Sequence, residues 1–304
     1  MNTNSLEDTW NAPDLSCQVA VVAGATRGVG RGIAEVLGTC GATVYVTGRS
    51  TRETSTRSRS DWTVEAVAET IRSHGGTAIP VRCDHRHDDQ VEQLFHRVAD
   101  EQGRLDILVN NLVGWSDSLS GSITGEPGWA DDSLGLPLWE QPLTWWDVNF
   151  RGGVRAHVAN CRFGIPLMLD QPGGLILFTS EKPRPSPDRA FDTVLDLRAQ
   201  VTARLVDLLA RQLFDYEITC VLLYPGWTRT HDIVAAIEAG RYKLSKTLED
   251  LNEQTVSPQF AGRATACLAA DPIAIERSGQ VLIAADLARK YGFTDIDGRQ
   301  PNPL

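Results

Sequence analysis

The chain has 304 residues, of which 42% are hydrophobic and 22% are charged, and its formal net charge is −10. These are ordinary values for a globular protein. The negative charge argues against wholesale binding to nucleic acid or anionic membranes, and no apolar run reaches the roughly 18 residues of a membrane span. The N-terminus lacks the apolar segment of a signal peptide, and the six cysteines are scattered without a CxxC pair. We therefore expect a cytoplasmic protein that binds neither nucleic acid nor membranes.

Short apolar runs alternate along the chain with segments of helical character. The runs predicted to be strands are 18–24, 42–48, 77–82, 105–109, 174–180, 217–224 and 280–285. The segments predicted to be helices are 28–38, 61–74, 88–102, 144–170, 190–214, 231–254 and 258–270. This alternation predicts right-handed βαβ units, and therefore an α/β fold with a doubly wound parallel sheet of the Rossmann type. Ligands of such sheets bind at the carboxyl ends of the strands.

Residues 17–304 are predicted to form one domain, preceded by a flexible tail at 1–16. Residues 114–143 are rich in Gly, Pro and Trp and show no secondary-structure period. They are longer than ordinary connections, so we interpret them as a functional insert. Residues 231–256 are interpreted as a substrate loop.

A glycine-rich turn follows the first predicted strand and opens the first predicted helix. Glycine lets the backbone turn sharply and approach a pyrophosphate closely, and the helix N-terminus offers N–H donors and a positive partial charge. The residues of this turn predicted to bind a dinucleotide are Gly24, Thr26, Arg27, Gly28, Val29 and Gly30.

Arg49 follows the second strand, where an NAD-binding protein would carry Asp or Glu for the ribose 2′-hydroxyl. Arginine suits a 2′-phosphate because its planar fork presents several donors, and Arg27 would lie nearby. We therefore predict NADP(H) as the cofactor. The competing interpretation of Arg49 is a solvated loop charge.

The Gly24-xxx-Gly28-x-Gly30 spacing resembles the glycine motif of the short-chain dehydrogenase/reductase superfamily, and the resemblance runs from about residue 17 to 290. It implies that Asp84 bonds the adenine amine and that Asn110 belongs to a looser version of the family's NNAG turn. The segment that holds the nicotinamide and phosphates in that family is matched by Pro225, Gly226, Thr228 and Thr230. The resemblance also implies a homodimer or homotetramer, in which helices 144–170 and 190–214 pack across a two-fold axis.

Residues 83–89 contain two histidines and several aspartates, which raises the alternative of a metal site. Asp84 fits the adenine role, however, and Asp88 fits the first turn of a helix. We therefore predict no bound metal.

The superfamily uses an Asn, a Ser, a Tyr and a Lys. By the resemblance, Asn149 matches the Asn, and Ser180 matches the Ser, whose hydroxyl would bond a substrate oxygen. The Tyr would transfer the proton, with its pKa lowered by the Lys ammonium. Counting back from the Pro-Gly pair puts Leu195 at the Tyr position and Ala199 at the Lys position. Counting forward from Ser180 gives Thr193 and Leu197 instead, and no register gives Tyr-xxx-Lys within 181–216. Ordinary alcohol and ketone chemistry should therefore be impaired.

Two carboxyl side chains are candidates to replace the missing phenol. Asp192 shares a helix face with Leu195 and Ala199, and Glu181 follows Ser180 directly. A carboxylic acid beside an apolar wall can have a raised pKa and act as an acid. The competing interpretations are a helix cap for Asp192 and a solvated charge for Glu181.

Five of the eight tryptophans lie between 115 and 146. A Trp-rich insert at the edge of an α/β sheet suggests a bulky apolar or aromatic small-molecule substrate, although some of these side chains must belong to the core. The residues predicted to contact the substrate are Trp115, Trp145, Leu195, Ala199 and Trp227.

Three functions remain open. The first is an NADP(H)-dependent reductase of a C=N or C=C bond, because an iminium accepts hydride without a proton donor at oxygen and an alkene can take its proton from water or a carboxyl group. The second is a redox-silent cyclase or isomerase that works by positioning and electrostatics. The third is a binding protein without activity. We favour the first because the predicted phosphate-binding residues are complete.

Overall fold

The computed structural model describes residues 10–54, 61–112, 136–181, 193–231, 234 and 255–302. Within this part of the chain, seven strands form one parallel sheet in the order β3-β2-β1-β4-β5-β6-β7. The strands are β1 (Val19–Ala23), β2 (Thr43–Gly48), β3 (Thr77–Arg82), β4 (Ile107–Asn110), β5 (Gly174–Thr179), β6 (Ile218–Tyr224) and β7 (Val281–Ile283). The chain builds outward from β1 to β3 and then crosses to β4 on the other side of β1. The predicted doubly wound Rossmann-type fold is therefore confirmed.

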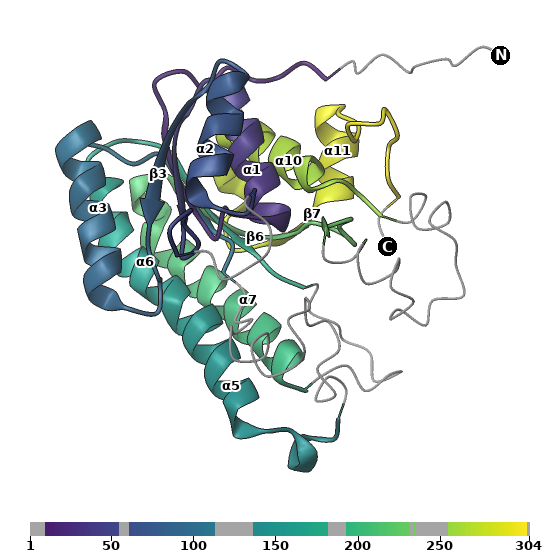
Figure 1. The fold of residues 1–304 in the computed structure, drawn as a ribbon. Coiled ribbons are helices and arrows are strands. Elements are labelled where there is room, and N and C mark those ends of the chain that lie inside the picture. Colours follow the sequence, from purple (N-terminus) through teal and green to yellow (C-terminus); the bar gives the residue numbers. More distant parts are fainter. Residues whose placement is uncertain are drawn as a thin grey trace.

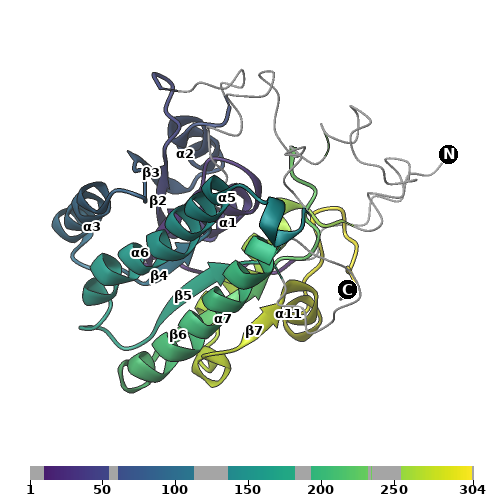
Figure 2. The same ribbon diagram turned by 90° about the horizontal axis from the view of Figure 1, so that it is seen from below.

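Helices cover both faces of the sheet (Figures 1 and 2). The α-helices are α1 (Gly28–Thr39), α2 (Val64–Ser73), α3 (Asp88–Gln102), α5 (Leu143–Asn149), α6 (Ala156–Gly164), α7 (Thr193–Leu213), α10 (Pro258–Ala270) and α11 (Ala284–Tyr291). Short 3-10 turns are η1 (Leu138–Glu140), η3 (Ile165–Leu167), η4 (Phe214–Tyr216) and η5 (Ala274–Arg277). None of the helices in the described ranges is both long and apolar enough to cross a membrane.

The sheet separates two hydrophobic cores because successive side chains of a strand point to opposite faces. Ala20 and Val22 of β1 point into the core shared with α1, α2, α10 and α11. Val19 and Val21 of the same strand point into the core shared with α3, α6 and α7. Burial on both faces explains the near-continuous apolar runs from which the strands were predicted.

The long helix predicted at 144–170 is interrupted in the structure. α5 ends at Asn149, and the π-helical turn η2 (Phe150–Arg155) connects it to α6. Single π-helical turns within α-helices are rare and occur frequently at functional sites. The interruption follows directly after a predicted catalytic residue.

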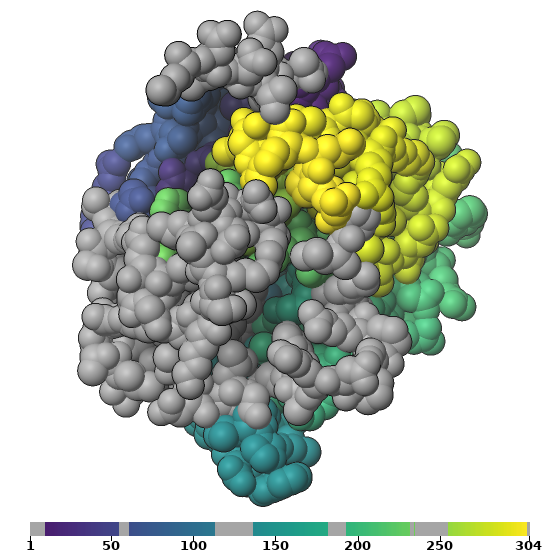
Figure 3. Space-filling view, turned by 90° about the vertical axis from the view of Figure 1, so that its right-hand side faces the viewer, coloured from purple at the N-terminus to yellow at the C-terminus, as the bar shows by residue number. Residues whose placement is uncertain are grey.

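The last predicted strand, 280–285, is partly wrong. β7 ends at Ile283, and Ala284 begins α11, a helix that the pattern did not predict. Alanine-rich sequence favours a helix, and Gly292 ends α11 in the left-handed conformation that is common after a helix. The chain then returns to α10, where Asp295 accepts hydrogen bonds from the backbone N–H (2.8 Å) and the hydroxyl of Ser257. This C-terminal segment forms the yellow surface in Figure 3.

The N-terminal tail was predicted to be flexible through residue 16, and the structure differs from this. Leu15 is fully buried, and Trp10 packs against the same core and against Arg263. The domain therefore includes the chain from residue 10 onward. Residues 114–135 of the predicted insert, and most of the predicted helical segment 231–254, lie outside the described residues.

Candidate active site

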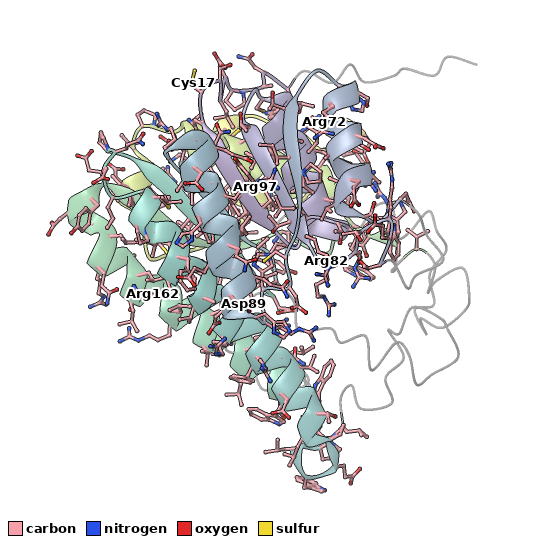
Figure 4. All side chains as sticks on the ribbon, turned by 60° about the vertical axis from the view of Figure 1, so that its left-hand side comes forward. Cys17, Arg72, Arg82, Asp89, Arg97 and Arg162 are labelled. Carbon is pink, nitrogen blue, oxygen red and sulfur yellow. The ribbon has the colours of Figure 1, made fainter. Side chains whose placement is uncertain are left out.

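The predicted cofactor residues follow strands at the carboxyl edge of the sheet. Figure 4 shows Arg82, the last residue of β3, and Asp89, in the first turn of α3, near this edge. Cys17, which precedes β1, and Arg72, in the last turn of α2, lie at the opposite edge. The parallel strands thus bring segments that are distant in sequence to one edge, as the fold predicts.

Asn111, the first residue after β4, holds the glycine-rich turn in place. Its Nδ2 donates to the Gly24 carbonyl at 3.1 Å, and its Oδ1 accepts from Thr179 Oγ1 at 2.8 Å. A Cβ at Gly30 would lie 2.3 Å from the Gly24 carbonyl oxygen and 2.5 Å from Asn111 Nδ2, so a larger residue does not fit there. The turn is therefore tied to the end of β5, directly before Ser180.

The middle glycine of the motif faces more open space. Gly28 has φ +54, and the nearest described atom to a Cβ there would be Thr230 Cγ2, at 3.4 Å. Arg27 precedes α1 without capping it through its side chain, and the first helical turn contains no acidic residue. The N–H groups of this turn are thus placed to receive an anion. These features fit a dinucleotide pyrophosphate between the turn and Thr230.

Trp62 connects the glycine-rich turn with the segment after β6. The guanidinium carbon of Arg27 lies 5.6 Å from the Trp62 ring centroid, and the Trp62 and His231 ring centroids are 6.2 Å apart. The first contact is within the range of a cation–π interaction. Arg27 is therefore held at the phosphate-binding end of the edge.

Asp84, the residue predicted to bond adenine, lies beside two arginines. Arg86 Nε and Nη2 donate to its carboxylate at 2.6–3.2 Å. Burial would raise the pKa of Asp84, but the hydrogen bonds from Arg86 and the charge of Arg49 lower it to about 2. Arg49 thus lies close to the residue expected at the adenine, which fits the predicted 2′-phosphate contact.

Asn110 does not reach the cofactor edge with its side chain. It is fully buried, its Oδ1 accepts from Asn160 Nδ2 at 2.9 Å, and its Nδ2 approaches Cys161 Sγ at 3.8 Å. The side chain therefore joins β4 to α6, because the last residue of β4 points toward that face. The residue that contacts the glycine-rich turn is its neighbour Asn111. Both asparagines belong to the motif, and the sequence alone did not show which of them makes this contact.

The two histidines of the 83–89 segment point apart. His85 is buried, with its ring nitrogens 2.9 Å from Thr47 Oγ1 and 2.7 Å from Asn160 Oδ1. His87 is exposed. Burial lowers the pKa of His85 to about 4, so it is neutral at neutral pH. Among the described residues there is no group of three or more His, Cys, Asp or Glu side chains suited to hold a metal ion.

The segment after β6 is anchored by backbone pairing to the start of α10. Val256 N donates to Trp227 O at 2.9 Å, and Arg229 N donates to Val256 O at 2.7 Å. Gly226 has φ +88, and Thr228 Oγ1 donates to its carbonyl at 3.2 Å. The pairing fixes the Pro-Gly turn at the carboxyl edge, where the predicted nicotinamide contacts were expected.

Asn149, Ser180 and Glu181 come together around a residue that the sequence interpretation missed, Arg198. Arg198 Nη1 donates to Asn149 Oδ1 at 3.0 Å. Its Nη2 donates to both carboxylate oxygens of Glu181, at 2.5 and 2.6 Å. Ser180 Oγ donates to Glu181 Oε2 at 3.4 Å, and Asn149 Nδ2 donates to Trp145 O at 2.9 Å. Three of the four residues predicted to be catalytic, Asn149, Ser180 and Glu181, therefore belong to one network with a buried guanidinium at its centre.

The π-helical turn provides space for this guanidinium. A Cβ at Gly153 would lie 3.0 Å from Arg198 Cδ, so the glycine lets the arginine stem pass close to η2. His157, on the next turn, is fully buried, and burial together with the charge of Arg198 lowers its pKa to about 3. His157 is therefore neutral and adds no second charge beside Arg198.

The raised pKa considered for Glu181 as a candidate acid is not found in the structure. Burial would raise the pKa, but the charge and hydrogen bonds of Arg198 lower it below the ordinary value for glutamate. Glu181 is therefore an ionised carboxylate at neutral pH and cannot serve as a resting acid. The sequence suggested an apolar wall beside Glu181, whereas the structure places a guanidinium there.

The positions assigned to the missing Tyr and Lys are filled by apolar packing. Leu195 forms a small core cluster with Trp145 and Val194, and Ala199 is also buried. α7 contains neither Tyr nor Lys. Substrate contact by Trp145, Leu195 or Ala199 stays a prediction, since each is buried in the structure.

The hydroxyl of Ser180 donates to Glu181 Oε2 at 3.4 Å. Tyr216 lies before β6 begins, at the opposite edge of the sheet from Ser180. Trp227 is half-buried. The predicted sites Asp192 and Trp115 lie outside the described residues.

The fold and site geometry agree with a known family. A family model described as short chain dehydrogenase matches residues 18–182. The chain belongs to the short-chain dehydrogenase/reductase superfamily. Members of this superfamily are oxidoreductases, and the resemblance seen in the motifs of the sequence is thus confirmed at the level of the family.

Curated relatives of the superfamily match nearly the whole chain. Dehydrogenase/reductase SDR family member 1 of Mus musculus is 34% identical over 289 residues, which cover 93% of this chain and 84% of the relative. The Homo sapiens protein of that name is 32% identical over 292 residues, covering 95% and 86%. A solved 7α-hydroxysteroid dehydrogenase, in complex with NADH and 7-oxo glycochenodeoxycholic acid, has a TM-score of 0.68 at 22% identity and covers 100% of this chain and 99% of its own. The last similarity concerns the fold alone.

Proposed function

We propose that this protein is an NADP(H)-dependent reductase whose site works without the phenol of the superfamily. Its proposed reaction is the reduction of a C=N or conjugated C=C bond in a bulky apolar or aromatic metabolite. The observation that carries the proposal is the Arg198–Glu181 ion pair beside Ser180. Leu195 and Ala199, which the sequence comparison predicts at the Tyr and Lys positions, are buried on the same helix as Arg198.

The cofactor part of the proposal is supported by charge placement. Arg49 lies near Asp84 and Arg27 lies against Trp62, so both cations border the region in which the adenosine ribose of a dinucleotide would lie. Two guanidinium groups favour a 2′-phosphate over a 2′-hydroxyl. The solved neighbour is in complex with NADH, so the proposed preference for NADP(H) rests on Arg27 and Arg49 of this chain alone.

The bond that is reduced follows from the protonation state of Glu181. Bound NADPH supplies a hydride, and a ketone that receives it becomes an alkoxide that needs a proton or a strong hydrogen-bond donor. An ionised carboxylate supplies neither. An iminium becomes a neutral amine when it receives a hydride, and a conjugated alkene can take its proton from water. The residues around Ser180 therefore suit these substrates better than ketones.

A second candidate function is a redox-silent isomerase or cyclase. The specific observation in its favour is the same carboxylate, because an ionised Glu181 beside the hydroxyl of Ser180 can act as a base toward a bound substrate. In that case the cofactor would stay bound and unchanged.

We also propose a cytoplasmic homodimer or homotetramer. Exposed apolar side chains lie on α6 and α7, the helices expected to pack across a two-fold axis: Val158, Leu197, Val201 and Leu208. The six free thiols fit a reducing compartment. Light scattering at high protein concentration tests the assembly, and a monomer of 33.3 kDa would contradict it.

Loss of NADPH absorbance with a panel of cyclic substrates tests the proposed function. The panel contains dihydroisoquinoline as a cyclic imine, a conjugated cyclohexenone and tetralone as a plain ketone. We expect oxidation of NADPH with the imine or the enone and little or none with tetralone. Rapid reduction of tetralone would contradict the proposal, and chemical change of a substrate without loss of NADPH would favour the redox-silent alternative.

A further inference from the structure

The two side chains of the Arg198–Glu181 ion pair differ in their exposure to solvent. The side chain of Arg198 is 4% exposed, whereas that of Glu181 is 36% exposed. Glu181 directly follows Ser180 at the carboxyl end of β5, so its open side lies at the edge where the superfamily binds substrate. A ligand at this edge therefore meets the carboxylate first and the guanidinium behind it.

Arg198 is held in a direction that serves the carboxylate. Its Nη1 is bonded to Asn149, and Asn149 is bonded in turn to Trp145 O. Its stem passes Gly153 at close range. The bond to Asn149, which is itself held by Trp145, and the close contact of the side-chain stem with Gly153 keep the guanidinium from turning toward a ligand. The role of Arg198 is therefore to position Glu181 and keep it ionised.

The carboxylate retains capacity for a further donor. Two carboxylate oxygens offer about four acceptor positions. Arg198 Nη2 uses one on each oxygen, and Ser180 Oγ approaches Oε2 at the long distance of 3.4 Å. The side chain of Glu181 is 36% exposed, so a charged N–H donor of a ligand can reach it and take the place of the long Ser180 contact, forming the stronger kind of hydrogen bond.

We propose that Glu181, positioned by Arg198, recognises a positively charged nitrogen on the substrate, so that the substrate class is an iminium or ammonium compound with an apolar or aromatic framework. The net charge of −10 favours the approach of such a cation. This inference rests on the proposed function, because the cation is placed beside the cofactor that the function requires.

The hydride step balances without a proton donor from the protein. The hydride and its electron pair form the new C–H bond at the iminium carbon, and the π electron pair of the C=N bond becomes the lone pair of nitrogen. The positive charge moves from the substrate to the oxidised nicotinamide. Glu181 raises the fraction of imine that is protonated before this step and accepts the N–H hydrogen bond throughout.

Equilibrium binding of a matched pair of probes tests the inference independently of turnover. Tetrahydroisoquinoline is protonated at neutral pH, and isochroman has the same bicyclic frame with an uncharged ring oxygen. Calorimetry with the full chain loaded with NADP+ should show the amine binding at least about tenfold more tightly. Glu181→Gln should bring the affinities for the amine and the ether close together. Arg198→Lys should keep more of the wild-type preference for the amine than Arg198→Met does.

A control is the exposed Arg155–Asp88 pair, in which Nη1 and Nη2 of the arginine each donate to one carboxylate oxygen at 2.6–2.7 Å. Asp88→Asn should leave the amine preference unchanged, and NADPH affinity should stay the same in Glu181→Gln if that variant folds. Equal affinities in the wild type, a preference that survives in Glu181→Gln, or tighter binding of naphthoate than of the amine would each overturn the inference. Failure of NADPH to bind would contradict the proposed function instead. A preference for the amine measured without cofactor would then still support recognition of a cation by Glu181.

Discussion

Arg198 donates to both carboxylate oxygens of Glu181, and it lies one residue before Ala199, which the sequence comparison predicts at the lysine position of the superfamily. The superfamily uses that lysine to lower the pKa of a phenol. Here a buried cation from the same helix lowers the pKa of a carboxyl group instead. The positive charge of the site is thus retained, while the acid it acts on is different and is already ionised.

Removing Glu181 from the ion pair should lower the free energy of unfolding much more than removing Arg198. Glu181→Leu leaves a buried guanidinium without its counter-ion, which should lower the free energy of unfolding by about 3 kcal/mol. Arg198→Met leaves a carboxylate that is partly hydrated, so about 1 kcal/mol is expected after allowance for solvent screening. The double variant should return to within about 1 kcal/mol of the wild type. Urea unfolding of the four proteins measures this cycle.

The exposed Arg155–Asp88 pair provides the comparison for the cycle, and it should show little or no measurable coupling. Equal losses for Glu181→Leu and Arg198→Met, or additive losses in the double variant, would show that the two side chains do not act as a buried pair.

The amine affinity should depend on pH in a defined direction. The pKa of Glu181 is lowered in the folded protein, so the stability it contributes is present above the unfolded glutamate value of about 4.3 and is lost as pH falls through the lower folded value. Tetrahydroisoquinoline binding should therefore be flat near neutral pH and weaken only in acid, below the pH range in which free glutamate titrates. His157, with a pKa of about 3, stays neutral near neutral pH. Weakening near pH 6 would contradict the assignment.

Cofactor preference should depend on Arg49. Arg49→Ala removes a charge-assisted contact to the expected 2′-phosphate, so NADPH affinity should fall by about tenfold to a hundredfold while NADH affinity changes little. Calorimetry with both cofactors measures the two values. Equal or tighter binding of NADH by the wild-type protein would refute the preference for NADP(H).

Introducing the Tyr and Lys of the superfamily should lower the stability of the protein. Leu195→Tyr enlarges a side chain packed against Trp145, and Ala199→Lys places an ammonium beside Arg198. Each change should destabilise the protein by about 1–3 kcal/mol through overpacking. The double variant should gain slow tetralone reduction, measured by NADPH absorbance, without improving imine reduction. Faster imine reduction in this variant would show that a phenol is what the natural reaction lacks.

The sequence predicted the sheet, the helices and the glycine-rich turn because their signals are local. Apolar runs and helical periods reflect burial on one or both faces, and the turn is recognised by glycine spacing. The predictions failed where local signals conflict. The apolar run at the end of the chain hid the start of α11, and the choice between Asn110 and Asn111 depends on which face of the sheet a strand end presents.

Arg198 was missed although one signal was present. Leu195, Arg198 and Thr202 share the buried face of α7 at helical spacing. An arginine on a buried helix face requires an anionic partner. The sequence does not say which carboxylate that partner is, because the answer depends on how the end of β5 approaches α7. The lowered pKa of Glu181 could not be read from the sequence for the same reason.

The transfer of deuterium from labelled NADPH tests the central claim most directly. The protein is incubated with dihydroisoquinoline and NADPH that carries deuterium at the hydride-donating carbon, and the product is examined by mass spectrometry and NMR. We predict tetrahydroisoquinoline with one deuterium at the former C=N carbon, and loss of this reaction in Glu181→Gln under conditions in which the variant still binds NADPH. Label that remains in the cofactor with every imine and enone supplied, or deuterium transferred more readily to tetralone than to the imine, would contradict the account.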